Sequence, residues 1–463
     1  MRLGLFGILV WGFLQSSLVM AEALTIPVLV DAIASQHPSY LSEMRRSEAT
    51  KAEVDEAVAA FDMRVSQMSS FRTSGYYDGA IAQQQVSKPL ALLNAEISAT
   101  YRISSGDFPV YESEFDTLNG GELGLGLKLS LLQNRDLDKR RAELADSESR
   151  LDIRYAVQQI QNNAVVRQGI QSFLRWKRAQ RIRQVTADLL RLTESRLKGV
   201  EERVASGDLA AISVSELQTT LLQRKILLTE VERSVATARE QLAFYLPPDY
   251  RLPNSKHNLN DFDWPYALSE ASFDQATLDL DSHPALIALE NEIEVAMNAL
   301  RLAENQMLPE LDLTMKVSRD LGAGDPRLIG TDSAVLLNFE VPVGRRAARA
   351  KSQGAQARIH SLDLEKDAVR LGLTRDIEIR RQAWRFGQQL LEANSRAEEV
   401  ASHLLEQEAK RFEEGVGDQF ILISREAAAL EARVNTIEAE FALLNEELLL
   451  VAAMAKLVPQ DSD

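Results

Sequence analysis

The strongest constraint on the fold is the length of two segments that contain no proline, Asp136 to Arg203 and Ala350 to Glu414. Proline inside a helix removes a hydrogen bond and clashes with the preceding turn, so each segment can form one continuous helix. At ~1.5 Å per residue, ~65 residues make a rod of ~100 Å, several times the diameter of an ordinary domain. The chain is therefore expected to contain long helices rather than one globular core.

Glycine-rich turns follow both segments. Gly207-Asp208 follows the first, and Gly415-Val416-Gly417-Asp418 follows the second. Glycine adopts left-handed backbone angles without strain, so each turn can join two antiparallel helices. The returning helices carry apolar residues at heptad spacing, which predicts coiled-coil packing. These residues are Leu221, Leu228, Val235 and Leu242 in the first helix, and Leu430, Val434, Ile437, Phe441, Leu444, Leu448 and Val451 in the second.

The same landmarks occur in the same order in both halves of the chain. His37-Pro38 and His283-Pro284 stand 246 positions apart, but later landmarks are separated by only 208. The first copy therefore carries about 38 additional residues, which we place across 76–121. Two tandem copies of one unit are predicted. The later landmarks are Trp176 with Trp384, and Arg203-x-x-x-Gly207 with Arg411-x-x-x-Gly415.

The repeat gives the predicted domain boundaries. Residues 1–21 read as a secretory signal peptide, with an apolar stretch too short to span a membrane and cleavage after 21 or 23. Residues 22–246 form the first repeat, with its hairpin tip near 207, and 247–265 form a linker or equatorial segment rich in proline and turn formers. Residues 266–463 form the second repeat, with barrel strands at about 311–318 and 335–343 and a tip near 415–418.

Short segments with alternating apolar and polar residues lie between the predicted helices. Period two is typical of a strand with one wet and one dry face. The dry faces could pack in a separate β-domain, but in an exported chain contact with lipid fits better. About eight strands are needed to close a small barrel, so several copies must share one. The candidates are 65–75, 94–104, 122–131, 311–318 and 335–343, of which the first alternates poorly.

Composition excludes several classes of function. A net charge of −16 argues against nucleic-acid binding, and the absence of cysteine excludes disulfides and thiolate metal sites. The five histidines show no tight metal-ligand spacing, and neither a nucleophile elbow nor a phosphate-binding loop is present. We therefore expect no catalytic, cofactor-binding or metal site, and no enzyme.

In this order of features the chain resembles the outer membrane efflux protein family, the TolC-like outer-membrane factors. The resemblance rests on QHPSYLSEMRRSEA and SHPALIALENEIEV, on AENQMLPELDLTMKV, and on the tips in RVASGDLAAISVSEL and RFEEGVGDQFILISREAAALEA. It implies a mainly α fold with β, in which a long antiparallel α-helical coiled-coil barrel joins a transmembrane β-barrel completed by oligomerisation. It further implies a homotrimer with four barrel strands per subunit and twelve in all. Two of the four strands would come from the first copy, so its three candidate segments compete for two positions.

The resemblance also implies a function and partners. The chain would be the outer-membrane exit duct of a tripartite efflux or type I secretion system in a Gram-negative bacterium. Its helices would extend into the periplasm, where a periplasmic adaptor (membrane fusion) protein and an inner-membrane pump would meet it. The alternative is a periplasmic coiled-coil scaffold or adaptor without a pore. Because the helical unit occurs twice with strands inside each copy, the duct is favoured.

The resemblance places the inner aperture and the adaptor docking site at the tips. Aspartates repeated by threefold symmetry would repel, so a closed aperture needs compensating cations one turn away. The alternative is that the aspartates only cap the returning helices. The predicted site residues are Arg203, Gly207, Asp208, Arg411, Gly415, Gly417 and Asp418.

Overall fold

The structure is a computed structural model that describes residues 24–75, 77–90, 94–252, 263–341 and 343–458. The predicted signal peptide lies outside these residues. The chain divides into two compact units, each built from three stretches of sequence. Unit 1 comprises Met1–Tyr40, Val165–Leu268 and Gln382–Val451, and unit 2 comprises Leu41–Ala164, Ser269–Arg381 and Ala452–Asp463. Among the described helices, none combines the length and apolar character needed to cross a membrane.

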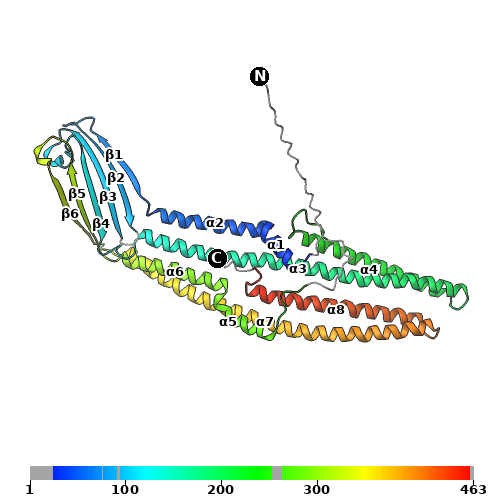
Figure 1. The fold of residues 1–463 in the computed structure, drawn as a ribbon. Helices are drawn as coiled ribbons and strands as arrows, with labels where there is room; N and C mark the ends of the chain where they lie inside the picture. Colours follow the sequence, from blue (N-terminus) through cyan, green and yellow to red (C-terminus); the bar gives the residue numbers. More distant parts are fainter. Residues whose placement is uncertain (1–23, 76, 91–93, 253–262, 342, 459–463) are drawn as a thin grey trace, which may run out of the picture. The chain divides into compact units, whose positions relative to one another are not determined.

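Long helices dominate both units (Figure 1). The two segments without proline form helices of 67 and 68 residues, α3 and α7, as expected from their sequences. A shorter helix returns from the end of each. The helices are α1 Ile26–Gln36, α2 Pro38–Ala59, α3 Lys139–Ala205, α4 Ile212–Ala243, α5 Glu270–Leu278, α6 Pro284–Asn305, α7 Arg346–Glu413 and α8 Gln419–Ala453, with short 3-10 turns η1 Val110–Phe115, η2 Asp279–Ser282 and η3 Pro326–Leu328.

The repeated His-Pro pairs begin helices of equal length. Helices α2 and α6 each have 22 residues and start at the proline, whose missing N–H costs nothing at a first helical position. The histidine before each proline accepts a hydrogen bond from a backbone N–H in the first turn of the helix. His283 Nδ1 accepts from the Ala285 N–H at 3.1 Å, and His37 Nδ1 accepts from the Ser39 N–H at 3.3 Å.

A single antiparallel sheet belongs to unit 2, and its strands lie in chain order (Figure 1). The strands are β1 Arg64–Phe71, β2 Gly79–Leu90, β3 Ala95–Gly106, β4 Glu122–Ser130, β5 Glu310–Asp320 and β6 Thr331–Glu340. Strands from the two predicted repeats meet where β4 pairs with β5, for example Leu125 with Val317. Strands β1 and β6 form the two edges.

The expectation of four strands per chain is wrong, because the described sheet has six. All three candidates in the first copy are strands and do not compete. Between them lies β2, which the sequence analysis missed, because Gln83, Gln84 and Gln85 give it no alternation. Backbone pairing with β1 and β3 holds these glutamines in a strand regardless of side-chain pattern. The additional residues of the first copy therefore form a full hairpin, β2–β3.

The sheet has one apolar and one polar face. Leu123 and Leu125 of β4 are 51% and 62% exposed on the apolar face, although leucine normally avoids water. Ion pairs occupy the polar face, where Arg102 lies 2.6 Å from Glu122 and Lys128 lies 2.7 Å from Asp312. Other large apolar residues exposed on the apolar face are Val65, Phe71, Ile97, Tyr101, Ile103, Met315, Val317, Val335, Leu337 and Phe339.

The last two residues of α8 and the residues after it belong to unit 2, where hydrogen bonds to α3 and to the start of α6 hold them. Asn163 of α3 donates from Nδ2 to the Ala452 carbonyl at 2.7 Å and accepts the Leu457 N–H at 3.0 Å. His283 Nε2 lies 3.1 Å from the Ala453 carbonyl. The start of α6 is thereby fixed to the end of the last helix.

Candidate functional site

Two left-handed glycines make the chain reversals at the helical tips in unit 1. Gly207 has φ +87° between α3 and α4, and Gly415 has φ +78° between α7 and α8. Gly417 is needed for a different reason. A Cβ atom there would lie 2.6 Å from the backbone nitrogen of Phe412, closer than real Cβ contacts. Both reversals lie directly after the two longest helices, α3 and α7.

The two tips pack against each other through a small apolar core. Val200, Leu217, Phe412 and Leu422 come from α3, α4, α7 and α8 and are all buried. A polar link closes the same region, since Gln419 Nε2 donates to the Ser213 carbonyl at 2.9 Å. The tips of both predicted repeats therefore form one structural element, which we call the tip cluster.

The predicted arginines lie at the tip cluster but do not pair with the predicted aspartates. The Arg203 guanidinium lies 5.4 Å from the centre of the Phe412 ring and donates to the Phe412 carbonyl at 3.4 Å. Arg411 pairs with Glu408 on its own helix at 3.2 Å. Arg203 thus joins α3 to the end of α7, while Arg411 stays on α7.

The two aspartates differ in their local contacts. Asp418 Oδ1 accepts the N–H groups of Phe420 and Ile421 at 2.7 and 3.3 Å, which caps the start of α8. Asp208 accepts the Ser206 hydroxyl at 3.2 Å, and the N-cap position of α4 is Ala211. Capping accounts for Asp418 but leaves Asp208 exposed in the turn.

A buried ion triad next to the tip cluster was not predicted. Glu426 of α8 is 1% exposed and pairs with both Arg196 of α3 and Arg224 of α4. The Arg224 Nη2 to Glu426 Oε2 distance is 2.6 Å, and Arg224 also donates to the Thr193 hydroxyl. One signal was present in the sequence, because Arg224 occupies the heptad series of Val231 and Ala238, where an apolar residue is expected.

A second buried carboxylate in unit 1 accepts hydrogen bonds from two tryptophans, one in the predicted linker and one in the second predicted repeat. Glu447 of α8 accepts the Trp264 indole N–H at 2.6 Å and the Trp384 indole N–H at 3.2 Å. Trp264 belongs to the predicted linker 247–265, of which residues 253–262 lie outside the described part. Glu447 therefore anchors the end of the linker to α7 and α8.

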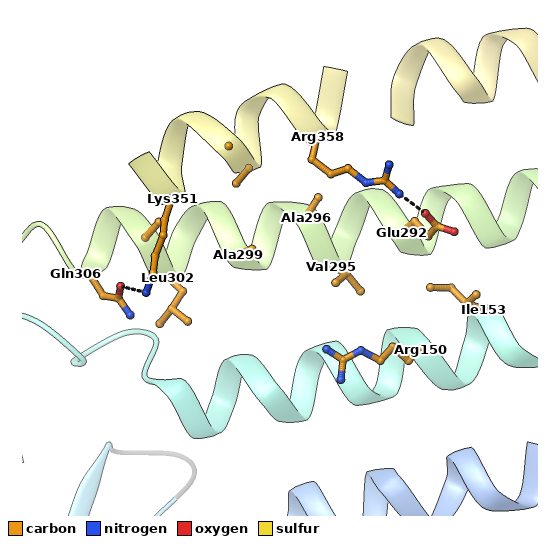
Figure 2. A pocket seen from close by; sticks show the side chains of 13 residues that line it. Arg150, Ile153, Glu292, Val295, Ala296, Ala299, Leu302, Gln306, Lys351 and Arg358 are labelled. Atoms are coloured by element: carbon orange, nitrogen blue, oxygen red, sulfur yellow. Dashed lines mark hydrogen bonds and ion pairs between the residues drawn. The ribbon is translucent and has the colours of Figure 1, made fainter. Parts of the chain in front are cut away.

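A groove of about 720 Å³ lies in unit 2 between α3, α6 and α7 (Figure 2). Small apolar residues such as Ala296, Ala299 and Gly354 line it. The charged groups at its rim are engaged, since Arg358 pairs with Glu292 at 3.0 Å and Lys351 donates to Gln306 at 3.2 Å. Within the described ranges, no group of three or more acidic or histidine side chains is placed to hold a metal ion.

Comparison with known proteins identifies the fold. A scan against protein-family models and a search of curated proteins give no match. Solved structures do match. The outer-membrane channel OprN superposes with a TM-score of 0.63 at 16% identity, covering 93% of this chain and 90% of OprN. The Campylobacter jejuni CmeC channel gives 0.63 at 13% identity, covering 95% and 87%. The open state of the Neisseria gonorrhoeae MtrE channel gives 0.62 at 13%, covering 93% and 88%.

The chain thus has the fold of outer-membrane channel proteins over nearly its whole length. The resemblance to TolC-like outer-membrane factors is confirmed at the level of the fold, and so is the predicted mainly α fold with a β-sheet. The matched structures named here are outer-membrane channels.

Proposed function

We propose that this protein is the outer-membrane channel of a tripartite efflux or type I secretion system, conducting substrates passively to the exterior. The observation that carries the proposal is the sheet, whose apolar face is exposed on strands as different in sequence as β4 and β6. Such a face is costly in water and favourable against hydrocarbon. The structural likeness to outer-membrane channels supports the same placement.

In this proposal the apolar face contacts outer-membrane lipid and the polar face lines water. The sheet in the described part of one copy has six strands and two open edges, so it cannot enclose a pore alone. Three copies, the number implied by the family resemblance, would share one barrel and one helical tunnel. The long helices would extend into the periplasm.

The tip cluster would form the inner aperture of the tunnel and receive the periplasmic adaptor, behind which the inner-membrane pump stands. Threefold symmetry would repeat Asp208 and Asp418 as rings of three carboxylates. Helix capping holds the Asp418 ring in place, whereas the Asp208 carboxylate accepts the Ser206 hydroxyl as its one side-chain partner among the described residues. We therefore assign the gating charge to Asp208 first.

Fractionation tests the location. The protein should sediment with outer membranes and need detergent for extraction. Release by osmotic shock, as expected of a soluble scaffold, would contradict the proposal. Planar-bilayer recordings test the gate: Asp208→Asn should change the conductance of the inserted protein at least twofold more than Asp418→Asn. Equal conductance of both variants and the parent protein would remove the gate role and leave the duct.

A further inference from the structure

The two edge strands of the sheet, β1 and β6, each have an outer side that could pair with another strand. Every residue of β1 and β6 is exposed, and neither strand has a partner on its outer side within the described chain. Six consecutive antiparallel strands place β1 and β6 in opposite directions. The β6 edge of one copy can therefore pair in antiparallel fashion with the β1 edge of another. In lipid such pairing is required, because unpaired backbone groups have no water to bind.

We propose that β1 pairs with β6 of a second copy of this chain in one particular register. In that register Arg64 lies opposite Glu340 of the partner subunit, and Met68 lies opposite Leu336 of the partner subunit. Each step forward along β1 is matched by one step back along β6. The proposal rests on the proposed channel function, and three features of the edges fix the register.

The first feature is charge. Arg64 begins β1 five positions after the end of α2, and Glu340 ends β6 six positions before α7 begins, so both mark the helix-proximal end of the sheet. Both also lie on the polar face, because Arg64 pairs with Ser87 and Glu340 pairs with Glu310. Neither side chain forms an ion pair within the described ranges. Joining the two edges in this register supplies each with an opposite charge.

The second feature is a pair of exceptions to the alternation. Met68 and Leu336 are apolar residues on the polar face, and they are 57% and 48% exposed. The register set by the charges brings these two side chains together. Across β1–β2, polar-face residues form the hydrogen-bonded pairs, as the Arg72 N–H donates to the Gly79 carbonyl at 2.8 Å. On the free edge of β1 they must then form non-hydrogen-bonded pairs, in which side chains approach most closely.

The third feature is the stagger that a closed barrel needs. Within one copy, the row of directly paired residues that starts at Arg64 ends at Ala334 of β6. The proposed register moves the junction six residues along β6, to Glu340, which is one residue per strand over six strands. With standard strand dimensions this corresponds to a tilt of about 35°, inside the range of closed barrels. Without the stagger, only Arg64 to Gln67 would pair.

This closure predicts a wide pore. Three copies of a six-stranded sheet supply eighteen strands, where the family resemblance implied twelve. Barrel diameter grows roughly linearly with strand number, so the strand cylinder would be about half as wide again, near 33 Å. The hairpin β2–β3 provides the added strands, and its Gln83, Gln85 and Thr100 line a polar cavity of about 630 Å³ together with residues of β4 and β5. Conduction would then be limited at the tip cluster and the outer loops, and not by the barrel wall.

Disulfide trapping tests the register, because the chain has no cysteine of its own. The full-length double variant Met68→Cys/Leu336→Cys should form a covalent trimer on oxidation in isolated outer membranes. The shifted pair Met68→Cys/Ala334→Cys is the matched control and should link at least tenfold less. Variants with only one of the two cysteines should form no covalent trimer. Efficient linking of the shifted pair would overturn the register.

Charge exchange and an alternative edge complete the test. Arg64→Glu or Glu340→Arg alone should lower the temperature at which the trimer dissociates, and the double exchange should restore it. Efficient linking of Thr100→Cys/Leu336→Cys instead would show that β3, not β1, pairs with β6 of the next copy, in a twelve-stranded barrel. That result would overturn the proposed β1–β6 pairing but leave the channel function standing. A protein that is monomeric in the membrane would contradict both the β1–β6 pairing and the channel function.

Discussion

The Arg224 guanidinium of α4 lies 2.6 Å from the Glu426 carboxylate of α8, in a site where Glu426 is 1% exposed. Arg196 of α3 binds the other carboxylate oxygen. One anion and two cations, with Glu426 and Arg224 buried and Arg196 half-buried, thus meet between three helices beside the tip cluster. Desolvation makes such a group costly unless every partner is present, so the triad can only persist while the two hairpins stay together.

This arrangement predicts a large effect for Glu426→Gln. The two arginines would lose their counter-charge while still buried, which costs about 3 to 5 kcal/mol. The expected result is a lower midpoint of thermal unfolding and faster proteolysis at the tips. Glu216→Gln is the matched control, since Glu216 stands 210 positions before Glu426, on the returning helix α4, and is exposed. Equal effects of the two substitutions would show that burial of the triad does not stabilise the tips.

The second prediction concerns Gly417. A Cβ atom at this position meets the Phe412 backbone nitrogen at 2.6 Å and its Cα at 2.8 Å, and neither can move without distorting the end of α7. Gly417→Ala should therefore destabilise the tip cluster by about 1 to 3 kcal/mol.

Gly199→Ala on α3 is the control for this prediction. Beyond its own helix backbone, a Cβ atom at this position would have no neighbour within 4 Å. Helix propensity should therefore dominate and stabilise α3 by roughly 0.5 to 1 kcal/mol. Opposite shifts of the unfolding midpoint in the two variants are expected. Shifts of the same sign would contradict the steric argument.

The third prediction is acid sensitivity at the start of α6. Burial lowers the pKa of His283, while its contact with the Ala453 carbonyl raises it by less. The hydrogen bonds of the His283 imidazole require its neutral form, because Nδ1 accepts from the Ala285 N–H and protonation would remove that acceptor. Below the unfolded pKa of about 6.5 the unfolded chain binds more protons than the folded one. The free energy of unfolding should therefore decrease as pH falls through this range.

Unfolding midpoints measured from pH 8 to pH 5 check the prediction. His283→Asn keeps an N-cap acceptor without a titrating group and should flatten the pH dependence. Burial lowers the pKa of His37 as well, so the double variant with His37→Asn should be flatter still. Exposed His403 provides the control, and His403→Asn should leave the slope as it is. An unchanged slope in the double variant would rule out this origin of acid sensitivity.

The fourth prediction concerns the loops at the far end of the sheet from the helices. The Gly120 N–H of the β3–β4 loop donates to the Leu321 carbonyl of the β5–β6 loop at 2.8 Å. Leu118, which is 2% exposed, packs beside Gly324 of the β5–β6 loop. Residues of both loops, such as Asp116 and Arg327, line the polar cavity beside the strands. If the polar face lines a pore, these loops narrow its outer mouth.

Leu118→Ala should then loosen the loops and admit larger solutes, because loss of a buried leucine costs about 2 to 5 kcal/mol. Growth inhibition of cells expressing the variant by a bulky antibiotic should increase. Ile329→Ala, which removes a 67% exposed side chain from the same pair of loops, should have little effect. Identical sensitivity of both variants would exclude a role for Leu118 in holding the mouth.

The sequence alone determined the features that depend on local backbone chemistry. The absence of proline set α3 and α7, left-handed glycines at 207 and 415 set the reversals, and His-Pro pairs set the starts of α2 and α6. Strict alternation in 122–131 was sufficient to identify β4. Each of these depends on residues that are neighbours in sequence, so spacing encodes them directly.

Only the tertiary structure decided which segments pair and which charges are buried. Strand β2 exists because β1 and β3 offer backbone partners on both sides, although its three consecutive glutamines carry no strand pattern. Glu216 and Glu426 both lie in the first turns of a returning helix, but Glu216 is exposed. Glu426 is enclosed by arginines that lie 202 and 230 positions away in the chain. Burial and pairing depend on surfaces brought together from distant segments, and local spacing carries no record of them.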